Sequence, residues 1–250
     1  MTTRPKKSAG RASSALSPLG IGIVTVAALI GFGALVVMGG GFAAPTDAPP
    51  TAVPLDQVSD EVAMAGGPLE VTDLVDCGGA PCPAIGPEDA PVTFIEVSEY
   101  TCPHCRDHNQ DVAPQLVEEF VDTGQMRLVS HIFAMTPTTM YVAAASLCAE
   151  EQGKYFEFQH EAFKDDLGLS GAEVASASED VATRLGLDVA AFKECAEESR
   201  YMEQVQLSSL DVQRAEVLYT PTFIVNGLII EGGQPVELLR TKIEQAIEEG

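Results

Sequence analysis

The apolar and polar positions divide the chain into parts with different patterns. Residues 19–38 carry no charged side chain, and Thr25 is the one polar residue among them. A helix of about 20 residues spans roughly the 30 Å of bilayer hydrocarbon, so this run predicts a transmembrane segment over residues 19–40. Residues 41–85 are rich in Gly, Ala and Pro, which predicts a flexible tether that includes a loop between Cys77 and Cys82.

Residues 86–250 alternate between strand-like and helix-like patterns. The predicted elements are, in chain order, a strand at 92–97, a helix at 103–122, a strand at 126–133, a helical block at 137–217, a hairpin at 223–230 and a helix at 235–248. Pro114 is expected to kink the first helix, and Asn226-Gly227 is a strong hairpin turn. Upstream of this region, Leu69 to Val75 reads as a short strand.

This order predicts an α/β architecture, namely a thioredoxin-like fold with an inserted all-helical subdomain. A β-α-β unit and a β-β-α unit built around one sheet form the predicted core, over residues 86–136 and 218–250. The helical insertion between them covers residues 137–217. The N-terminal transmembrane segment precedes this domain.

Charge then orients the predicted membrane segment. Residues 1–18 contain basic residues and no acid, so they are expected to form a cytoplasmic tail, with the rest of the chain on the other side. The prediction is a single-pass protein of the cytoplasmic membrane whose folded domain lies in the periplasm or the extracellular space. A cleaved signal peptide is the alternative, but the apolar run is longer than a usual signal core and Gly41-Phe42-Ala43-Ala44 is only a passable cleavage site.

The whole chain is acidic, with 14 Lys and Arg against 37 Asp and Glu and a formal net charge of −23. Phosphate binding needs clustered cations, so this composition argues against a nucleic-acid partner. The acidity is interpreted as a solvated surface.

Cys102-Pro103-His104-Cys105 carries the main chemical signal. Two thiols at i and i+3 on a first helical turn can close a small disulfide, and the helix N-terminus favours a thiolate. A zinc site needs further ligands in a partner motif, and a purely structural disulfide seldom has this spacing, so a redox pair is favoured. Cys102 is expected to be the exposed nucleophile, with His104 favouring its thiolate and Cys105 acting as the buried resolving thiol.

This motif resembles the active site of the DsbA family of exported thiol–disulfide oxidoreductases. The segment from Gly86 to Cys105 is similar to the start of the family's catalytic domain, and the likeness covers about residues 85–250. It implies that Pro221 is a cis-proline facing the redox pair, and that Thr220 contacts the substrate backbone together with Pro103. A trans-proline that merely opens a strand is the alternative for Pro221.

Glu96 lies in the apolar strand six residues before Cys102. A carboxylate in a central strand can accept the Cys105 proton, and the family resemblance implies a buried acid at this place. The alternative is a strand-edge glutamate that points to water.

The six cysteines are read as three pairs, because exported chains usually oxidise them. Cys102–Cys105 is the redox pair, and Cys148–Cys195 is a structural bridge between two helices of the insertion, a reading that the resemblance supports. Cys77–Cys82 is predicted to be a small structural loop disulfide, with a second redox pair or a metal site as alternatives. The histidines at 108, 131 and 160 show no ligand spacing with one another or with these cysteines, so no metal site is predicted.

Together these observations predict a membrane-tethered, exported thiol–disulfide oxidoreductase that donates disulfides to folding proteins. Its substrates would be exported protein thiols, and no dissociable cofactor is expected. The family resemblance suggests a quinone-linked membrane thiol oxidase as the reoxidising partner. The position of Thr220 is occupied by valine in many DsbA-type oxidases and by threonine in isomerase-like relatives. A reductase or isomerase is therefore one alternative. A non-enzymatic metal-binding or chaperone-like module is the other.

Overall fold

The computed structural model describes residues 68–250. The predicted basic tail, the membrane segment over 19–40 and most of the tether lie outside these residues. Among the helices from residue 68 onward, none combines the length and the apolar character that a bilayer crossing requires.

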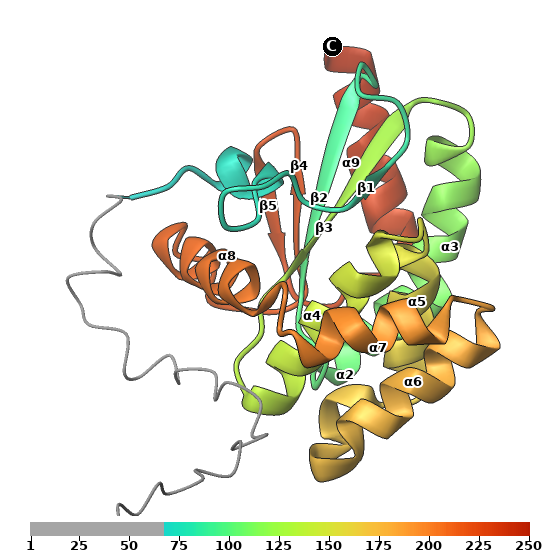
Figure 1. The fold of residues 1–250 in the computed structure, drawn as a ribbon. Helices are drawn as coiled ribbons and strands as arrows, with labels where there is room; N and C mark the ends of the chain where they lie inside the picture. Colours follow the sequence, from blue (N-terminus) through green and yellow to red (C-terminus); the bar gives the residue numbers. More distant parts are fainter. Residues whose placement is uncertain (1–67) are drawn as a thin grey trace, which may run out of the picture. The chain divides into compact units, whose positions relative to one another are not determined.

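A five-stranded sheet forms the centre of the described region, with the strand order β1-β3-β2-β4-β5 (Figure 1). Its strands are β1 (Ala84–Ile85), β2 (Val92–Ser98), β3 (Met126–Ile132), β4 (Thr222–Val225) and β5 (Leu228–Glu231). The central strands β2 and β3 are parallel, and the other neighbouring pairs are antiparallel. Asn226 and Gly227 form the β4–β5 turn with φ of 45° and 92°, a conformation that these two residue types tolerate best. The strands predicted at 92–97 and 126–133 and the hairpin predicted at 223–230 are thereby confirmed.

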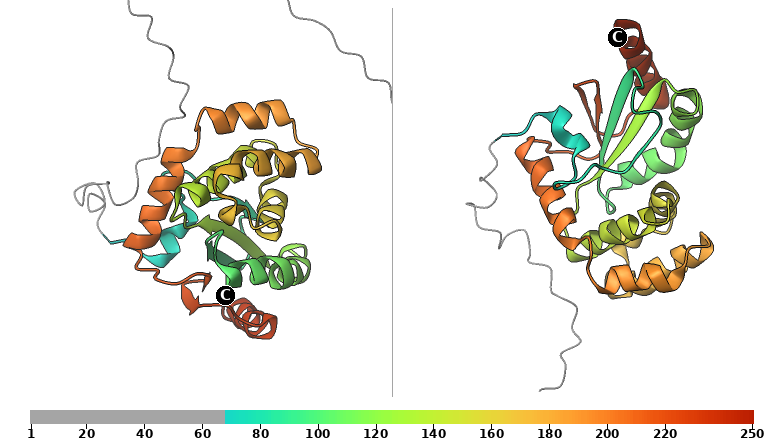
Figure 2. Two further views of the ribbon diagram at one scale, coloured as in Figure 1. Left: turned by 90° about the horizontal axis from the view of Figure 1, so that it is seen from below. Right: turned by 45° about the horizontal axis from the view of Figure 1, so that its top comes forward.

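The two faces of the sheet are covered by different helices because side chains alternate along each strand. Phe94 points into a cluster with Leu239 of α9 (Val236–Glu249) and Leu116 of α3 (Ala113–Leu116). Its neighbour Ile95 points the other way, into a cluster with Val212 of α8 (Met202–Arg214). Figures 1 and 2 show α9 and α3 on one side of the sheet and α8 on the other.

The helical block packs around its first helix. It comprises α4 (Pro137–Glu150), α5 (Tyr155–Lys164), α6 (Val174–Arg184), α7 (Val189–Glu197) and α8, with short 3-10 turns at Leu167–Leu169 and Gly171–Glu173. α4 is buried along most of its length because its alanines let neighbouring helices approach closely, and Phe158 and Phe192 fill the space beside it. The Cys148–Cys195 disulfide links α4 to α7.

The helix that begins at Pro103 is less regular than predicted. It comprises α2 (Pro103–Asp107), a π-helical turn over His108–Val112, α3, and a second π-helical turn over Val117–Val121. Pro114 has no N–H to donate within the helix, and its ring crowds the preceding turn. The first wide turn ends two residues before Pro114, a place where helices commonly depart from α-helical geometry.

The strand predicted over Leu69–Val75 is wrong. Residues Val71–Val75 form a 3-10 helix, because the side chains of Glu70 and Asp73 cap its first turn reciprocally. Leu74 is its one fully buried side chain, and it packs against the sheet with Cys77 and Cys82. Packed structure therefore starts upstream of residue 86, where the domain was predicted to begin.

The structure contains both predicted structural disulfides, and they close loops of very different length. The cysteines are separated by 5 positions in Cys77–Cys82 and by 47 in Cys148–Cys195. Loop entropy predicts that replacing Cys148 and Cys195 by Ala lowers the free energy of unfolding by about 4 kcal/mol. The same change at Cys77 and Cys82 should lower it by about 2 kcal/mol. Denaturant titration of both double variants tests this order, and a larger loss for the short loop contradicts it.

Candidate dithiol active site

Cys102 lies where the chain leaves β2 and enters the helix. It is the N-cap of α2, with extended backbone angles (φ −78°, ψ 117°), and Pro103 occupies the first helical turn. The Cys102 sulfur accepts a hydrogen bond from the backbone N–H of Cys105 at 3.4 Å. A sulfur at this position takes the place of the usual capping oxygen, so it satisfies a backbone donor that the helix leaves free.

The surroundings of Cys102 favour its thiolate. The pKa of its thiol is lowered to about 5, chiefly because the Cys105 thiol donates a hydrogen bond to it, with further help from Thr220 and from backbone N–H groups of Cys105 and His104. These interactions outweigh the partial burial of Cys102, which acts in the opposite direction. Cys102 is therefore ionised at neutral pH.

Cys105 has the opposite character. It is fully buried in the cluster that joins the sheet to the helical block. Burial raises the pKa of its thiol far above the usual value, and the neighbouring Cys102 sulfur raises it further. Both cysteines are free thiols in this structure, so one partly exposed sulfur with a lowered pKa lies beside one buried, protonated thiol.

The segment before β4 faces this pair. The Thr220–Pro221 peptide bond is cis, as the resemblance implied. The Cys102 sulfur lies 3.2 Å from the Thr220 carbonyl oxygen. Residues separated by 118 positions thus meet because β2 and β4 are neighbours in the sheet.

Glu96 is buried behind the pair, so the strand-edge alternative is excluded. Its side chain is 2% exposed and accepts a hydrogen bond from the Ser98 hydroxyl. The Nε2 atom of His108 lies 3.7 Å from a Glu96 carboxylate oxygen, and the His108 ring packs against Phe223. Burial lowers the pKa of His108 despite the nearby carboxylate, so the contact joins a neutral imidazole to the acid.

Pro103 and His104 lie on the exposed side of the motif. The His104 side chain is packed over Gly233, where an added Cβ would lie 3.3 Å from the His104 Cβ. Gly233 therefore makes room for this histidine beside the redox pair. His104 also contributes its backbone N–H to the stabilisation of Cys102.

Sequence reasoning missed three buried groups around the site. The Tyr100 hydroxyl lies 2.6 Å from the Ser146 hydroxyl of α4, which fastens the loop before Cys102 to the helical block. Glu99 is buried and accepts a hydrogen bond from the Thr101 N–H at 2.6 Å. His108, for which the sequence shows only the absence of ligand spacing, is the third buried group. Its neighbours become evident only when the helix is packed on the sheet, since no sequence spacing links it to Glu96.

A cavity of about 460 Å³ lies between α3 and α5, and its lining includes Glu96 but not Cys102. A smaller cavity of about 240 Å³ has His104, His108 and Gly233 in its lining. The buried acid therefore borders a space that is separate from the exposed sulfur, and the first cavity offers water a route to Glu96.

Comparison with known proteins agrees with this geometry. A protein-family model described as Thioredoxin matches residues 81–245. The chain is 24% identical over 177 residues to disulfide bond formation protein D of Bacillus subtilis, a match that covers 66% of this chain and 77% of that protein. It is 23% identical over 184 residues to a protein named as a protein-disulfide oxidoreductase in Rickettsia felis, covering 73% of this chain and 65% of the relative.

A crystal structure of Wolbachia pipientis α-DsbA1 has the same fold, with a TM-score of 0.60 and 22% identity over 66% of this chain and 90% of that one. The chain belongs to the thioredoxin family, whose model covers most of it. Within that family it is a DsbA-like thiol–disulfide oxidoreductase. A thiol–disulfide oxidoreductase is an enzyme, so the non-enzymatic alternative for this chain is excluded.

The ionisation of Cys102 also affects stability. Its pKa of about 5 in the folded dithiol form lies below the ordinary value of 9.0 that applies when the chain is unfolded. The thiolate therefore stabilises the folded dithiol form fully above pH 9. This contribution falls as the pH decreases towards 5, and it is absent below that.

The rate at which iodoacetamide alkylates Cys102 in the dithiol form should follow the thiolate fraction, with a midpoint near pH 5. Replacing Cys105 by Ala removes the thiol donor that lowers this pKa most, so the midpoint should move to higher pH. Mass spectrometry of the alkylated peptide measures both profiles. A midpoint at the ordinary thiol value in the unmodified protein contradicts the assignment.

Proposed function

We propose that this chain is a membrane-tethered, exported oxidase that transfers disulfides to folding proteins through Cys102 and Cys105. The observation that carries the proposal is the stabilised thiolate at Cys102 beside a buried partner with a raised pKa. Whatever favours the Cys102 thiolate favours the dithiol form, so the disulfide form accepts electrons readily.

The reaction proceeds by two thiol–disulfide exchanges. A substrate thiolate attacks the Cys102 sulfur of the Cys102–Cys105 disulfide, and the Cys105 sulfur leaves and takes up a proton. A second substrate thiolate then attacks the substrate sulfur of the mixed disulfide and releases Cys102 as a thiolate. Two electrons pass from two substrate thiols to the cysteine pair, and the substrate keeps the new disulfide.

Glu96 is assigned to the proton transfer at Cys105. Cys105 must gain a proton when it leaves, and it must lose one when the pair is reoxidised. Glu96 is buried close enough to influence the Cys105 thiol electrostatically, and the cavity beside it supplies a path for the proton to solvent. Thr220 and Pro221 are assigned to holding the substrate backbone beside Cys102, together with Pro103.

Exposed apolar side chains around Cys102 support an unfolded polypeptide as substrate. Leu218 is 76% exposed and Tyr219 is 60% exposed, and they directly precede Thr220. Leu169 is also exposed, and it follows Gly168, which packs closely against the backbone of Tyr100. Such side chains can bind the apolar segments that a chain still exposes before it folds.

The location and the reoxidising partner are part of the same proposal. The apolar residues 19–38 and the basic residues before them support an anchor in the cytoplasmic membrane with an outward-facing catalytic domain. An anchor keeps the dithiol form near the membrane, where a quinone-linked thiol oxidase is the proposed electron acceptor.

Thr220 supports a second candidate, a reductase or isomerase with the same site. The reduction potential of the Cys102–Cys105 pair separates the two directions. We expect a value near that of a strong oxidant, about −120 mV, and a value near the −270 mV of thioredoxin contradicts the oxidase direction. Equilibrium titration with glutathione measures it.

Replacing Cys105 by Ala should trap mixed disulfides between Cys102 and exported proteins, because the resolving thiol is absent. Capture of many exported proteins from cells, identified by mass spectrometry, supports a general oxidase. The matched control is Cys102→Ser with Cys105 intact, which should trap none because the nucleophile is missing. Equal capture by the control, or capture of a single partner, contradicts a general role.

Replacing Glu96 by Gln should slow the reoxidation of the Cys102–Cys105 pair by about 100-fold, because the buried base for Cys105 is lost. Stopped-flow kinetics with a small disulfide oxidant measures this step. Glu118→Gln is the matched control, since Glu118 lines the same cavity but is exposed. Equal rates for the two variants exclude Glu96 from the proton transfer.

A further inference from the structure

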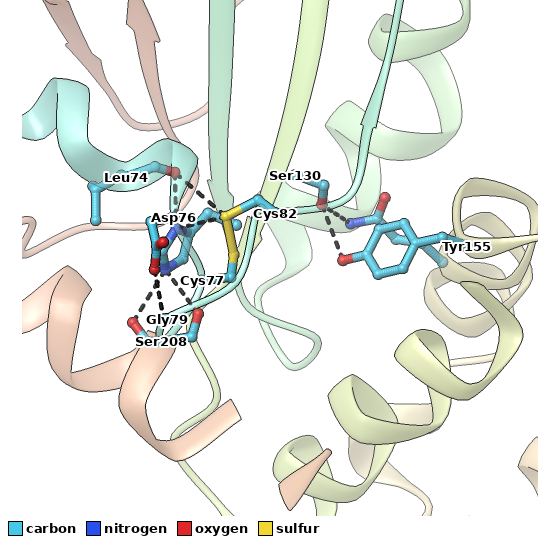
Figure 3. Close-up of a disulfide and its surroundings, with 10 residues drawn as sticks. Leu74, Asp76, Cys77, Gly79, Cys82, Ser130, Tyr155 and Ser208 are labelled. Carbon is cyan, nitrogen blue, oxygen red and sulfur yellow. Dashed lines mark hydrogen bonds between the residues drawn. A yellow bond between two sulfur atoms is a disulfide. The ribbon is translucent and has the colours of Figure 1, made fainter. Parts of the chain in front are cut away.

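The Cys77–Cys82 disulfide (Figure 3) lies beside a buried histidine, His131, that the proposed reaction does not use. His131 comes from β3 and is fully buried. Its Nδ1 atom is 3.5 Å from the Cys82 sulfur, and the ligand atoms of Cys77, Cys82 and His131 all lie within 4.8 Å of one another. The sequence spacing did not reveal this cluster, because β3 brings His131 to the loop from a distant part of the chain.

We propose that this cluster is a redox-gated zinc site, which is closed while Cys77 and Cys82 form a disulfide and binds one Zn²⁺ when they are reduced. Cys77, Cys82 and His131 are the protein ligands. Two thiolates and an imidazole are among the commonest zinc ligands in proteins. This inference does not depend on the direction of the reaction at Cys102.

One pair of ligand atoms, the Cys82 sulfur and His131 Nδ1, already has the spacing found around a tetrahedral ion. With zinc–sulfur bonds of about 2.3 Å and zinc–nitrogen bonds of about 2.0 Å, neighbouring ligand atoms lie roughly 3.4–3.7 Å apart. The Cys82 sulfur is 3.5 Å from His131 Nδ1 and 3.5 Å from the Leu74 carbonyl oxygen, which is itself 3.0 Å from Nδ1. Only the Cys77 sulfur must move, because in the disulfide it lies 2.00 Å from that of Cys82.

Ser208 of α8 can hold His131 in either proton arrangement. The Nε2 atom is 2.8 Å from the Ser208 hydroxyl and 3.1 Å from the Ser208 carbonyl oxygen. When Nδ1 carries the proton and donates to Leu74, the hydroxyl can donate to Nε2. When Nε2 carries the proton, it can donate to the hydroxyl oxygen at 2.8 Å or to the carbonyl oxygen at 3.1 Å, and Nδ1 keeps a lone pair for the metal. A histidine ligand whose other nitrogen donates to a carbonyl is the usual arrangement in zinc sites.

The loop is held in shape by contacts other than its disulfide. The Cys77 N–H donates to the Ala80 carbonyl at 2.7 Å, and the Cys82 N–H donates to the Val75 carbonyl at 2.9 Å. Gly78, at φ +68°, packs against α8 so closely that a Cβ there would lie 2.5 Å from the Gln204 carbonyl oxygen. The two sulfurs therefore stay near His131 after the bridge is opened.

Opening the site requires two electrons and two protons from a dithiol reductant, which is oxidised to its own disulfide. The Cys77–Cys82 bond breaks and two thiols form. Zinc then displaces both thiol protons as it binds the two sulfurs, so binding releases protons. Oxidation of the two sulfurs by a disulfide reverses these steps and expels the ion.

The test uses the full chain with Cys102→Ser and Cys105→Ser, so that the active-site thiols cannot bind the metal. Zn²⁺ alone is titrated against a chromophoric chelator before and after anaerobic reduction with a phosphine, and thiols are counted in parallel. We expect one tightly bound Zn²⁺ per chain after reduction and none before it. Co²⁺ in place of Zn²⁺ should show the absorption bands of thiolate ligation.

Two sets of variants complete the test. Cys77→Ser with Cys82→Ser should abolish binding, whereas the matched pair Cys148→Ala with Cys195→Ala should leave it intact. Ser208→Ala keeps all three ligands and should weaken the affinity by about 10-fold or more. If variants of His131 itself fail to fold, Ser208→Ala still measures the contribution of the histidine to zinc binding. The proposal is overturned if the reduced chain binds no zinc, if the loop cannot be reduced in the folded protein, or if zinc binding survives the loss of Cys77 and Cys82.

Discussion

The antiparallel pairing of β2 with β4 is the constraint on which the candidate site depends. Its register places Val97 opposite Thr222, so the loop that carries Cys102 and the cis-proline segment leave the sheet at the same edge. The Cys102 sulfur then reaches the Thr220 carbonyl, and Glu96 from the same strand is buried behind it. The helical block completes this arrangement from a third side, because the Tyr100 hydroxyl meets Ser146 of α4. The site thus combines groups from three separate segments of the chain.

The chemistry follows from the unequal environments of two identical side chains. Cys102 stands at a helix start where backbone N–H groups and a thiol donor point at its sulfur. Cys105, one turn further, is enclosed by the apolar cluster between the sheet and the helical block. A thiolate in this cluster would not be solvated, so the pKa of the Cys105 thiol is raised. Position on a single helical turn therefore gives the two thiols opposite pKa shifts. The π-helical turn that follows brings His108 to Glu96 and Phe223, so the same helix also shapes the surroundings of the buried acid.

Local patterns were sufficient to predict most of the fold and the central part of the site. The strand before Cys102, the Asn226-Gly227 hairpin and the helical block depend on short-range periodicity and turn chemistry, which a single sequence displays. The strand predicted over Leu69–Val75 is a 3-10 helix in the structure, because reciprocal capping by Glu70 and Asp73 outweighs the strand tendency of a short apolar run. The partners of His108 and His131 were missed for a different reason. They come from segments brought together only by packing, and no spacing rule connects them. The membrane segment over residues 19–40 stays a prediction.

The six cysteines differ in their exposure to solvent, and this difference determines which sulfurs can take part in thiol–disulfide exchange. All six cysteines lie in the described region, and Cys102 is the one that solvent reaches substantially. Cys148 and Cys195 are 1% and 0% exposed, so a thiol from solvent cannot reach the bridge that links α4 to α7. Cys77 and Cys82 are also buried, with an exposure of 5% each. Burial therefore limits thiol–disulfide exchange to Cys102 and protects the structural bridges from rearrangement.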